Sequence, residues 1–91
     1  WSFSPETVTA TKGSTINFHF YPGDHSVAQS SFDSPCVPSG SDAIYSGFIN
    51  PSSGVASKMF TMTVNDTSPI WIYCSRDMHC QSGMVMVINP P

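Results

Sequence analysis

Charged side chains are scarce in this sequence: they make up 10% of its 91 residues, well below the usual quarter. The only cations are Lys12, Lys58 and Arg76, and the net charge is −3. This composition argues against nucleic-acid binding, which needs a positively charged surface to neutralise phosphates. No apolar run approaches the roughly twenty residues needed to span a bilayer, so we expect no membrane insertion by this chain.

Helical periodicity is also missing, since no segment offers ten residues of it. Apolar residues instead alternate with polar ones or run continuously over short stretches, as in strands of a two-sheet core. Turn-forming Gly, Pro, Asn and Asp separate these stretches, which indicates a β-sandwich. The predicted strands are residues 6–10, 15–20, 25–29, 60–64, 70–74 and 84–88.

One long stretch, residues 34–54, is rich in Ser, Pro and Gly and has no clear period. We expect a loop there, with room for one helical turn, and a loop of this length must be pinned to the body of the protein.

A chain of 91 residues buries only one modest core, so residues 1–91 are expected to form a single domain. We also expect a monomer. Residues 90–91 look like the start of a linker or stalk. Because the sequence begins at Trp1 without a signal peptide, we expect a mature product or an excised domain.

Cysteine is sparse and its count is odd: there are three. In an oxidising compartment, this number predicts one disulfide and one thiol that is kept for chemistry. The triplet Asn65-Asp66-Thr67 is an N-glycosylation sequon, which predicts glycosylation at Asn65 and supports secretion.

The stretch from Cys74 to Met84 reads C-x4-H-x4-M and joins two predicted strands. A thiolate and a thioether are soft ligands suited to copper, and imidazole accommodates both copper oxidation states. A second imidazole must come from elsewhere, and His25 lies just after a Pro-Gly turn at the start of a predicted strand. Two His, one Cys and a weak axial Met form the ligand set of a type 1 (blue) copper site. The predicted copper ligands are His25, Cys74, His79 and Met84.

A structural zinc site is the main alternative, with His25, Cys74, His79 and Cys80 as its ligands. We favour copper because adjacent residues such as His79 and Cys80 tend to point in opposite directions. The zinc site would also leave Cys36 unpaired.

The other side chains of metal-binding type are better explained by packing or by solvent. Met62 and Met86 lie in predicted strands and Met59 directly precedes one, and packing is the ordinary role of methionine at such positions. Asp24 and Asp77 flank predicted ligands, and we expect them to be merely solvated.

Residues 73–74 and 79–84 closely resemble the copper loop of the plant phytocyanins. Further segments resemble fungal secreted cupredoxin-like proteins, in the same order along the chain: residues 3–10, 24–32, 34–36, 47–48 and 64–71. The resemblance implies a cupredoxin-like Greek-key β-sandwich of two sheets and the same four copper ligands. It also implies a disulfide between Cys36 and Cys80. One departure is Ser26, which stands where many cupredoxins have Asn after the first ligand His.

A copper ion held by four protein ligands has no open position for substrate, so we expect a one-electron carrier that cycles between Cu(I) and Cu(II), and no enzyme. The alternative is an extracellular module that sequesters or delivers copper without a redox partner. An unidentified redox partner would dock near His79. The fungal resemblance implies a secreted or cell-surface protein, lipid-anchored through a C-terminal region outside this chain.

Overall fold

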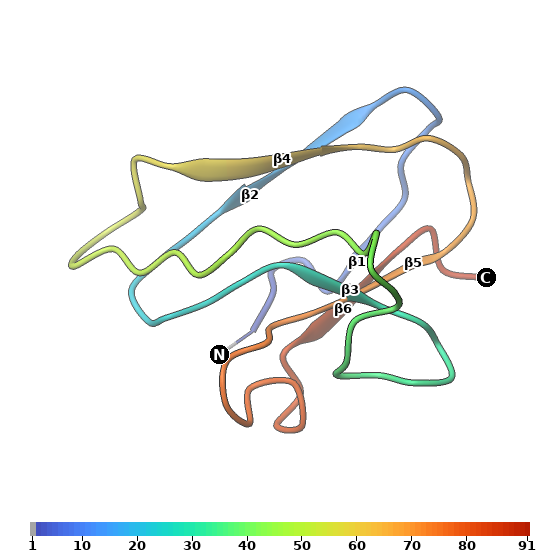
Figure 1. The fold of residues 1–91 in the computed structure, drawn as a ribbon. Coiled ribbons are helices and arrows are strands. Elements are labelled where there is room, and N and C mark those ends of the chain that lie inside the picture. The colour runs from blue at the N-terminus through green and yellow to red at the C-terminus, as the bar shows by residue number, and fades with distance from the viewer. Residues whose placement is uncertain (1) are drawn as a thin grey trace.

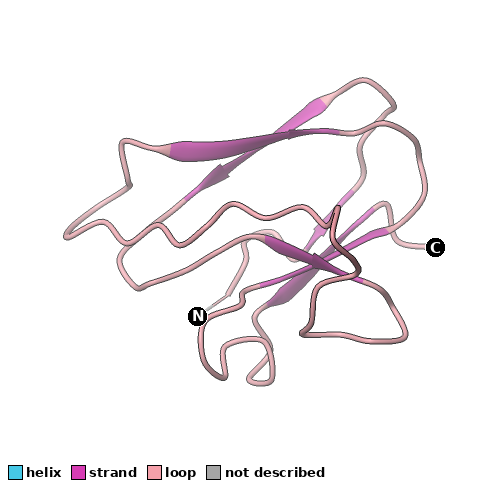
Figure 2. Ribbon diagram, in the orientation of Figure 1, coloured by secondary structure: helices cyan, strands magenta, loops and turns pink. Residues whose placement is uncertain are grey.

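The computed structural model describes residues 2–91, in which six strands form two sheets (Figure 1). The strands are β1 (Thr7–Val8), β2 (Thr15–His19), β3 (Ala28–Ser30), β4 (Met59–Thr63), β5 (Ile70–Tyr73) and β6 (Val85–Ile88). Figure 2 shows only strands and loops over this part of the chain. The helical turn allowed for in residues 34–54 was therefore a wrong expectation. With no helix among residues 2–91, the described chain contains no helical membrane span.

The larger sheet has the strand order β1-β6-β5-β3, and the smaller one pairs β2 with β4. Only the β1–β6 pair is parallel; the other three pairs are antiparallel. In the smaller sheet Phe18 lies opposite Phe60, and in the larger one Ile72 lies opposite Met86. The expectation of an all-β sandwich of two sheets is confirmed.

The core lies between the two sheets and follows from the alternation in the sequence. Side chains of a strand point to opposite faces in turn, so Phe18 is buried while its neighbours Asn17 and His19 are exposed. Met62 is buried on β4 in the same way, and Ile72 of β5 meets these side chains from the other sheet. Burying each large apolar side chain contributes about 1.5–3 kcal/mol, so this layer is the main source of stability. The buried cluster consists of Phe18, Phe20, Val27, Ile49, Met62, Ile72, Met86 and Ile88.

Five of the six strands are shorter than the pattern predicts, β1 and β3 most of all. β1 covers only Thr7–Val8, and β3 begins at Ala28, because β5 offers it a partner only over Ala28–Ser30. His25 pairs instead with Ile49 of the long loop in an isolated bridge. A second bridge joins Ala28 to Tyr45. These bridges hold the long loop against β3, so the loop is pinned as expected.

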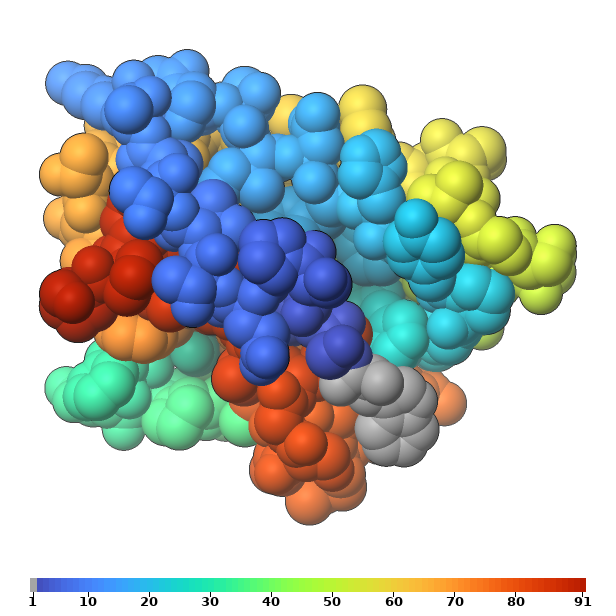
Figure 3. Space-filling model, turned by 180° about the vertical axis from the view of Figure 1, so that it is seen from behind, coloured from blue at the N-terminus to red at the C-terminus, as the bar shows by residue number. Residues whose placement is uncertain are grey.

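The connection from β5 to β6, residues 74–84, closes one end of the sandwich. In Figure 1 it is the orange loop at the bottom, and the C-terminus lies away from it on the other side of the molecule. Seen from behind, the same loop projects below the body of the protein (Figure 3). The turn between β4 and β5, which carries Asn65, lies at the far end of the sandwich (Figure 1). Asn65 itself is exposed.

Candidate metal centre

Three predicted ligands converge at the end of the sandwich closed by residues 74–84. Their donor atoms all lie within 4.8 Å of one another, and they belong to His25, Cys74 and His79. Cys74 Sγ is 3.8 Å from Nδ1 of His25 and 3.4 Å from Nδ1 of His79. Metal bonds of about 2.0–2.3 Å, as for zinc, would separate two donors in a trigonal plane by about 3.7 Å. The spacing of the sulfur and the two nitrogens therefore fits one ion among them.

The backbone of the loop holds its ligand residues together. Cys74 N–H donates to the Met84 carbonyl at 3.1 Å, and Met84 N–H donates to the His79 carbonyl at 2.9 Å. The chain winds between them with positive φ at Asp77 (40°) and Gly83 (106°). These hydrogen bonds join three proposed ligand residues that lie within 10 positions of one another. The main chain therefore holds the loop in this shape. Met84 has a buried side chain, and with His25 it lines a cavity of about 500 Å³.

His25 comes from a different part of the chain and is positioned by its own backbone. Its carbonyl accepts from Ile49 N–H at 2.9 Å, and its N–H donates to the Ile49 carbonyl at 3.4 Å. On the other side of the ring, Gly23 has φ +115° and approaches the Nε2 atom so closely that a Cβ there would collide with it. The glycine thus lets the ring turn Nδ1 toward Cys74.

The environment favours the ligating form of His25. Partial burial lowers the pKa of His25, and the charge that His79 can carry lowers this pKa further. A lowered pKa keeps the imidazole neutral, which is the form that binds a metal. Cys74 is fully buried and His79 is 5% exposed, so both donors are shielded from water.

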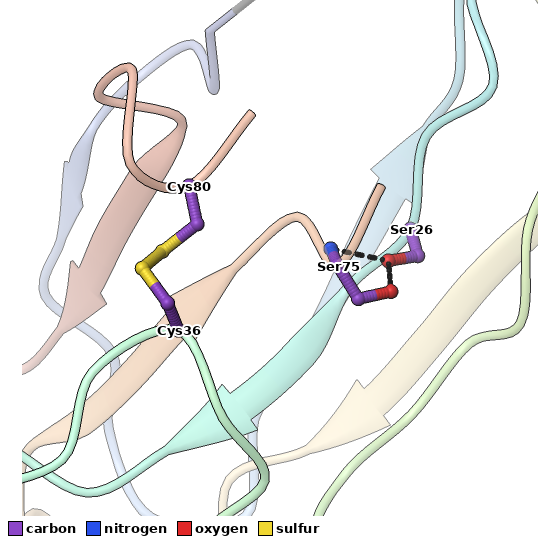
Figure 4. The surroundings of a disulfide bond; sticks show 4 residues. All are labelled: Ser26, Cys36, Ser75 and Cys80. Carbon is purple, nitrogen blue, oxygen red and sulfur yellow. Dashed lines mark hydrogen bonds between the residues drawn. A yellow bond between two sulfur atoms is a disulfide. The ribbon is translucent and has the colours of Figure 1, made fainter. Parts of the chain in front are cut away.

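The structure contains a disulfide between Cys36 and Cys80, with Cα atoms 5.7 Å apart (Figure 4). It ties the long loop to the residue beside His79. Cys74 is left as the free thiol. The alternative zinc site needed Cys80 as a thiolate, so the disulfide removes one of its ligands.

Several contacts around the centre were not predicted from the sequence. Asp24 and Asp77 were expected to be merely solvated, but each forms an ion pair with Arg76. Their Oδ2 atoms lie 3.3 Å and 3.2 Å from nitrogens of the Arg76 guanidinium. Ser26 Oγ lies 2.7 Å from Ser75 Oγ, which also joins the His25 turn to the loop of residues 74–84. The only sequence signal was Arg76, the one cation near the loop, since pairings between distant segments leave no periodic pattern.

The remaining methionines divide between packing and exposure. Met62 and Met86 belong to the core, as expected. Met59 was expected to pack, but its side chain is 48% exposed at the start of β4, opposite the exposed His19. The outer face of the two-stranded sheet is uncovered there, which explains the difference.

Comparison with known proteins places these features in a family, although no protein-family profile matches the sequence. The chain is 37% identical over 90 residues to a probable GPI-anchored cupredoxin-1 of the fungus Arthroderma benhamiae. It is 39% identical over 89 residues to an extracellular serine-rich protein of the same fungus. These alignments cover 99% and 98% of this chain, but the chain spans only 45% and 35% of the two relatives.

Among solved structures, dithionite-reduced auracyanin from Roseiflexus castenholzii superposes with a TM-score of 0.69 at 16% identity. The superposition covers 99% of this chain and 88% of auracyanin, so the two share a fold. One end of this all-β sandwich brings together His25, Cys74 and His79, with the buried Met84 on the same loop as the last two, and this group suits a type 1 copper site. The chain belongs to the cupredoxin family.

Proposed function

We propose that this domain binds one copper ion of type 1 through His25, Cys74, His79 and Met84. The convergence of one thiol sulfur and two imidazole nitrogens within 4.8 Å is the observation that carries the proposal. The ligand types support copper, because a soft thiolate with two imidazoles and a weak thioether is the blue-copper set. Cys80 is held in the disulfide, which leaves no second thiolate for a zinc site of the Cys-rich kind.

We further propose that the domain is a one-electron carrier and not an enzyme. Bound copper would supply the redox chemistry, by alternating between Cu(I) and Cu(II). The residues of the chain keep the donors in place in both states, since the backbone bonds among Cys74, His79 and Met84 do not involve the metal. Ligands that stay fixed reduce the rearrangement that accompanies each electron.

The redox partner would dock at the end of the sandwich near His79. His79 is itself buried, whereas its neighbour Met78 is 60% exposed, and Tyr21 beside the His25 turn is also exposed. Asp24 and Asp77 are both paired with Arg76, so little net charge is left there to steer a partner. Docking should therefore depend on apolar contact and respond weakly to salt.

Secretion is the setting that agrees with these features. The two fungal relatives carry names that describe an extracellular protein and a GPI-anchored one. A disulfide persists in an oxidising compartment, and Asn65 of the sequon is exposed. We propose that the protein is secreted or lies at the cell surface and is glycosylated at Asn65. A lipid anchor in a C-terminal region beyond this domain would attach it to the membrane. Mass spectrometry of the protein from a fungal host, before and after glycosidase treatment, tests the glycan.

Stopped-flow mixing tests the carrier role directly. The reduced copper-loaded domain is mixed with a small oxidised haem protein, and electron transfer is followed by absorbance. A carrier should react at about 10⁵ M⁻¹ s⁻¹ or faster, in the range of ordinary protein association. Sluggish electron exchange, together with copper transfer to an added chelator, would point instead to sequestration or delivery of copper.

A further inference from the structure

A histidine and a methionine face each other on the outer surface of the smaller sheet, outside the group of proposed copper ligands. His19 ends β2 and Met59 begins β4, and the antiparallel register places the two residues directly opposite each other (Figure 1). Both side chains are exposed, that of Met59 to 48%. Methionine ordinarily serves in packing, which the Met59 side chain does not do here. An imidazole and a thioether are therefore held together at the surface.

The spacing of the two residues suits one metal ion between them. Directly opposite residues of an antiparallel pair have Cβ atoms about 4.5–5.5 Å apart. Bonds of about 2.0 Å to nitrogen and 2.3 Å to sulfur, on opposite sides of one ion, would separate the two donors by about 4.3 Å. Exposed side chains that start from this Cβ spacing can reach that separation by rotating about their own bonds.

The rest of the outer face selects the kind of ion. The other four residues of this face are exposed and uncharged: Thr15, Asn17, Thr61 and Thr63. Thr61 Oγ1 donates to Asn17 Oδ1 at 2.8 Å, so these two side chains satisfy each other. The face thus offers no carboxylate to a hard cation such as Ca²⁺. A thioether selects Cu(I), and imidazole binds copper as well.

The pair also lies at one wall of a cavity that reaches the proposed copper centre. The cavity of about 500 Å³ that is lined by His25 and Met84 is lined by His19 too. Only five residues separate His19 from His25 in the sequence. An ion that leaves His19 can therefore meet two of the proposed ligands within this one cavity.

We propose that His19 and Met59 bind one Cu(I) ion on the outside of the smaller sheet and pass it along this cavity to the centre. Copper stays Cu(I) throughout. Its bonds to the pair break as bonds to the centre form, and the Cys74 thiol releases its proton to water. Binding by the pair is independent of the proposed function, whereas the transfer rests on it.

Titration with Ag(I) alone tests the surface site, because this ion shares the softness and filled shell of Cu(I) and does not oxidise in air. The methyl signals of the five methionines are followed by NMR in the metal-free domain. Met84 reports on the centre. Once its signal has stopped moving, that of Met59 should shift and saturate with one further equivalent, together with the His19 ring signals. Met78 is 60% exposed but lies in a loop, so it reports on a thioether without a cross-strand imidazole and should respond less.

Variants at exposed positions separate the pair from a single donor. His19→Gln and Met59→Leu should each weaken Ag(I) binding at this site at least about tenfold, because the second donor binds within the same molecule. Met62→Leu, on the buried face of the same strand, should leave the site unchanged. The double variant Met59→Leu, Thr61→Met moves the thioether opposite Asn17 and should not restore binding.

The rate of copper loading tests the transfer. The metal-free domain is mixed without oxygen with Cu(I) in acetonitrile, and samples are oxidised at intervals to read the blue absorbance. His19→Gln and Met59→Leu should load more slowly, in proportion to their loss of Ag(I) affinity, and should reach the same final absorbance. Equal loading rates in these variants and the original protein would contradict the transfer.

The surface site itself is overturned if Met59 and Met78 respond alike to Ag(I), which is the behaviour of any exposed thioether. It is also overturned if His19→Gln binds Ag(I) at Met59 as tightly as the original protein. Should the domain take up no copper at the centre, the proposed function is wrong, and the Ag(I) titration still decides whether the pair binds.

Discussion

The backbone N–H of Met84 donates to the carbonyl of His79 at 2.9 Å, so the last two proposed ligands are joined by the main chain. The first of the loop, Cys74, is joined to Met84 in turn. Three proposed ligands therefore keep their spacing without a metal. What the loop cannot supply by itself is the fourth, His25, whose backbone pairs with Ile49 and whose ring lies against Gly23.

Met84 and Met86 form a matched pair of positions that separates copper binding from packing. Both are buried, but Met86 belongs to the core while Met84 lies at the end of the loop. Met→Leu nearly conserves volume, so each variant should lose less than about 1.5 kcal/mol of stability. Only Met84→Leu should shift the copper reduction potential, because the axial ligand tunes it. Voltammetry of the two variants checks this, and equal potentials would remove Met84 from the ligand set.

Two glycines with positive φ form a second matched pair. An alanine at Gly13 (φ +88°) meets open space, whereas one at Gly23 meets the His25 ring. Both substitutions should cost about 1–2 kcal/mol for the left-handed backbone. Gly23→Ala should in addition weaken copper binding at least tenfold, measured by competition with a chelator of known affinity. Equal copper affinities in the two variants would show that Gly23 does not shape the site.

Removing the disulfide should destabilise the whole domain. The chain-entropy relation gives about 4 kcal/mol for a loop of this length. The double variant Cys36→Ser, Cys80→Ser should therefore unfold at a markedly lower urea concentration than the original protein. A thiol assay on the unfolded, unreduced and metal-free protein should find one thiol, that of Cys74. Three thiols would contradict the bond.

Stability of the metal-free domain should fall in mild acid. Burial holds the pKa of His25 below its ordinary value of 6.5, so the unfolded chain takes up this proton first as the pH falls. The contribution of neutral His25 to the free energy of unfolding is therefore complete above the unfolded pKa of 6.5. It is lost as the pH falls from 6.5 through the folded pKa. Urea unfolding at a series of pH values measures it, and His25→Gln should lose this dependence. A stability that rises as the pH falls through this window would contradict the sign.

The sequence was sufficient to predict the strands and to place three of the proposed ligands on one loop, for physical reasons that are visible in it. Alternation at Phe18 and Met62 predicts which face is buried, and the C-x4-H-x4-M spacing places three proposed ligands on one loop. Strand ends were less predictable, since β3 begins at Ala28 only because β5 pairs no earlier.

Contacts between distant segments were beyond the sequence. The Ser26–Ser75 bonds and the pairing of Asp24 with Arg76 depend on how the His25 turn meets the loop in space. No periodicity or spacing encodes such a meeting. These contacts join the His25 turn to the loop that carries the other proposed ligands, and only the structure shows them.

The optical and EPR spectra of the purified domain after addition of Cu(II) test the central claim most directly. The account predicts an intense blue colour from the bond between Cys74 sulfur and copper, with the small hyperfine splitting of a type 1 site. The colour should vanish on reduction and should be absent in Cys74→Ala. A colourless Cu(II) complex, or a tightly bound zinc ion that copper cannot displace, would contradict the account.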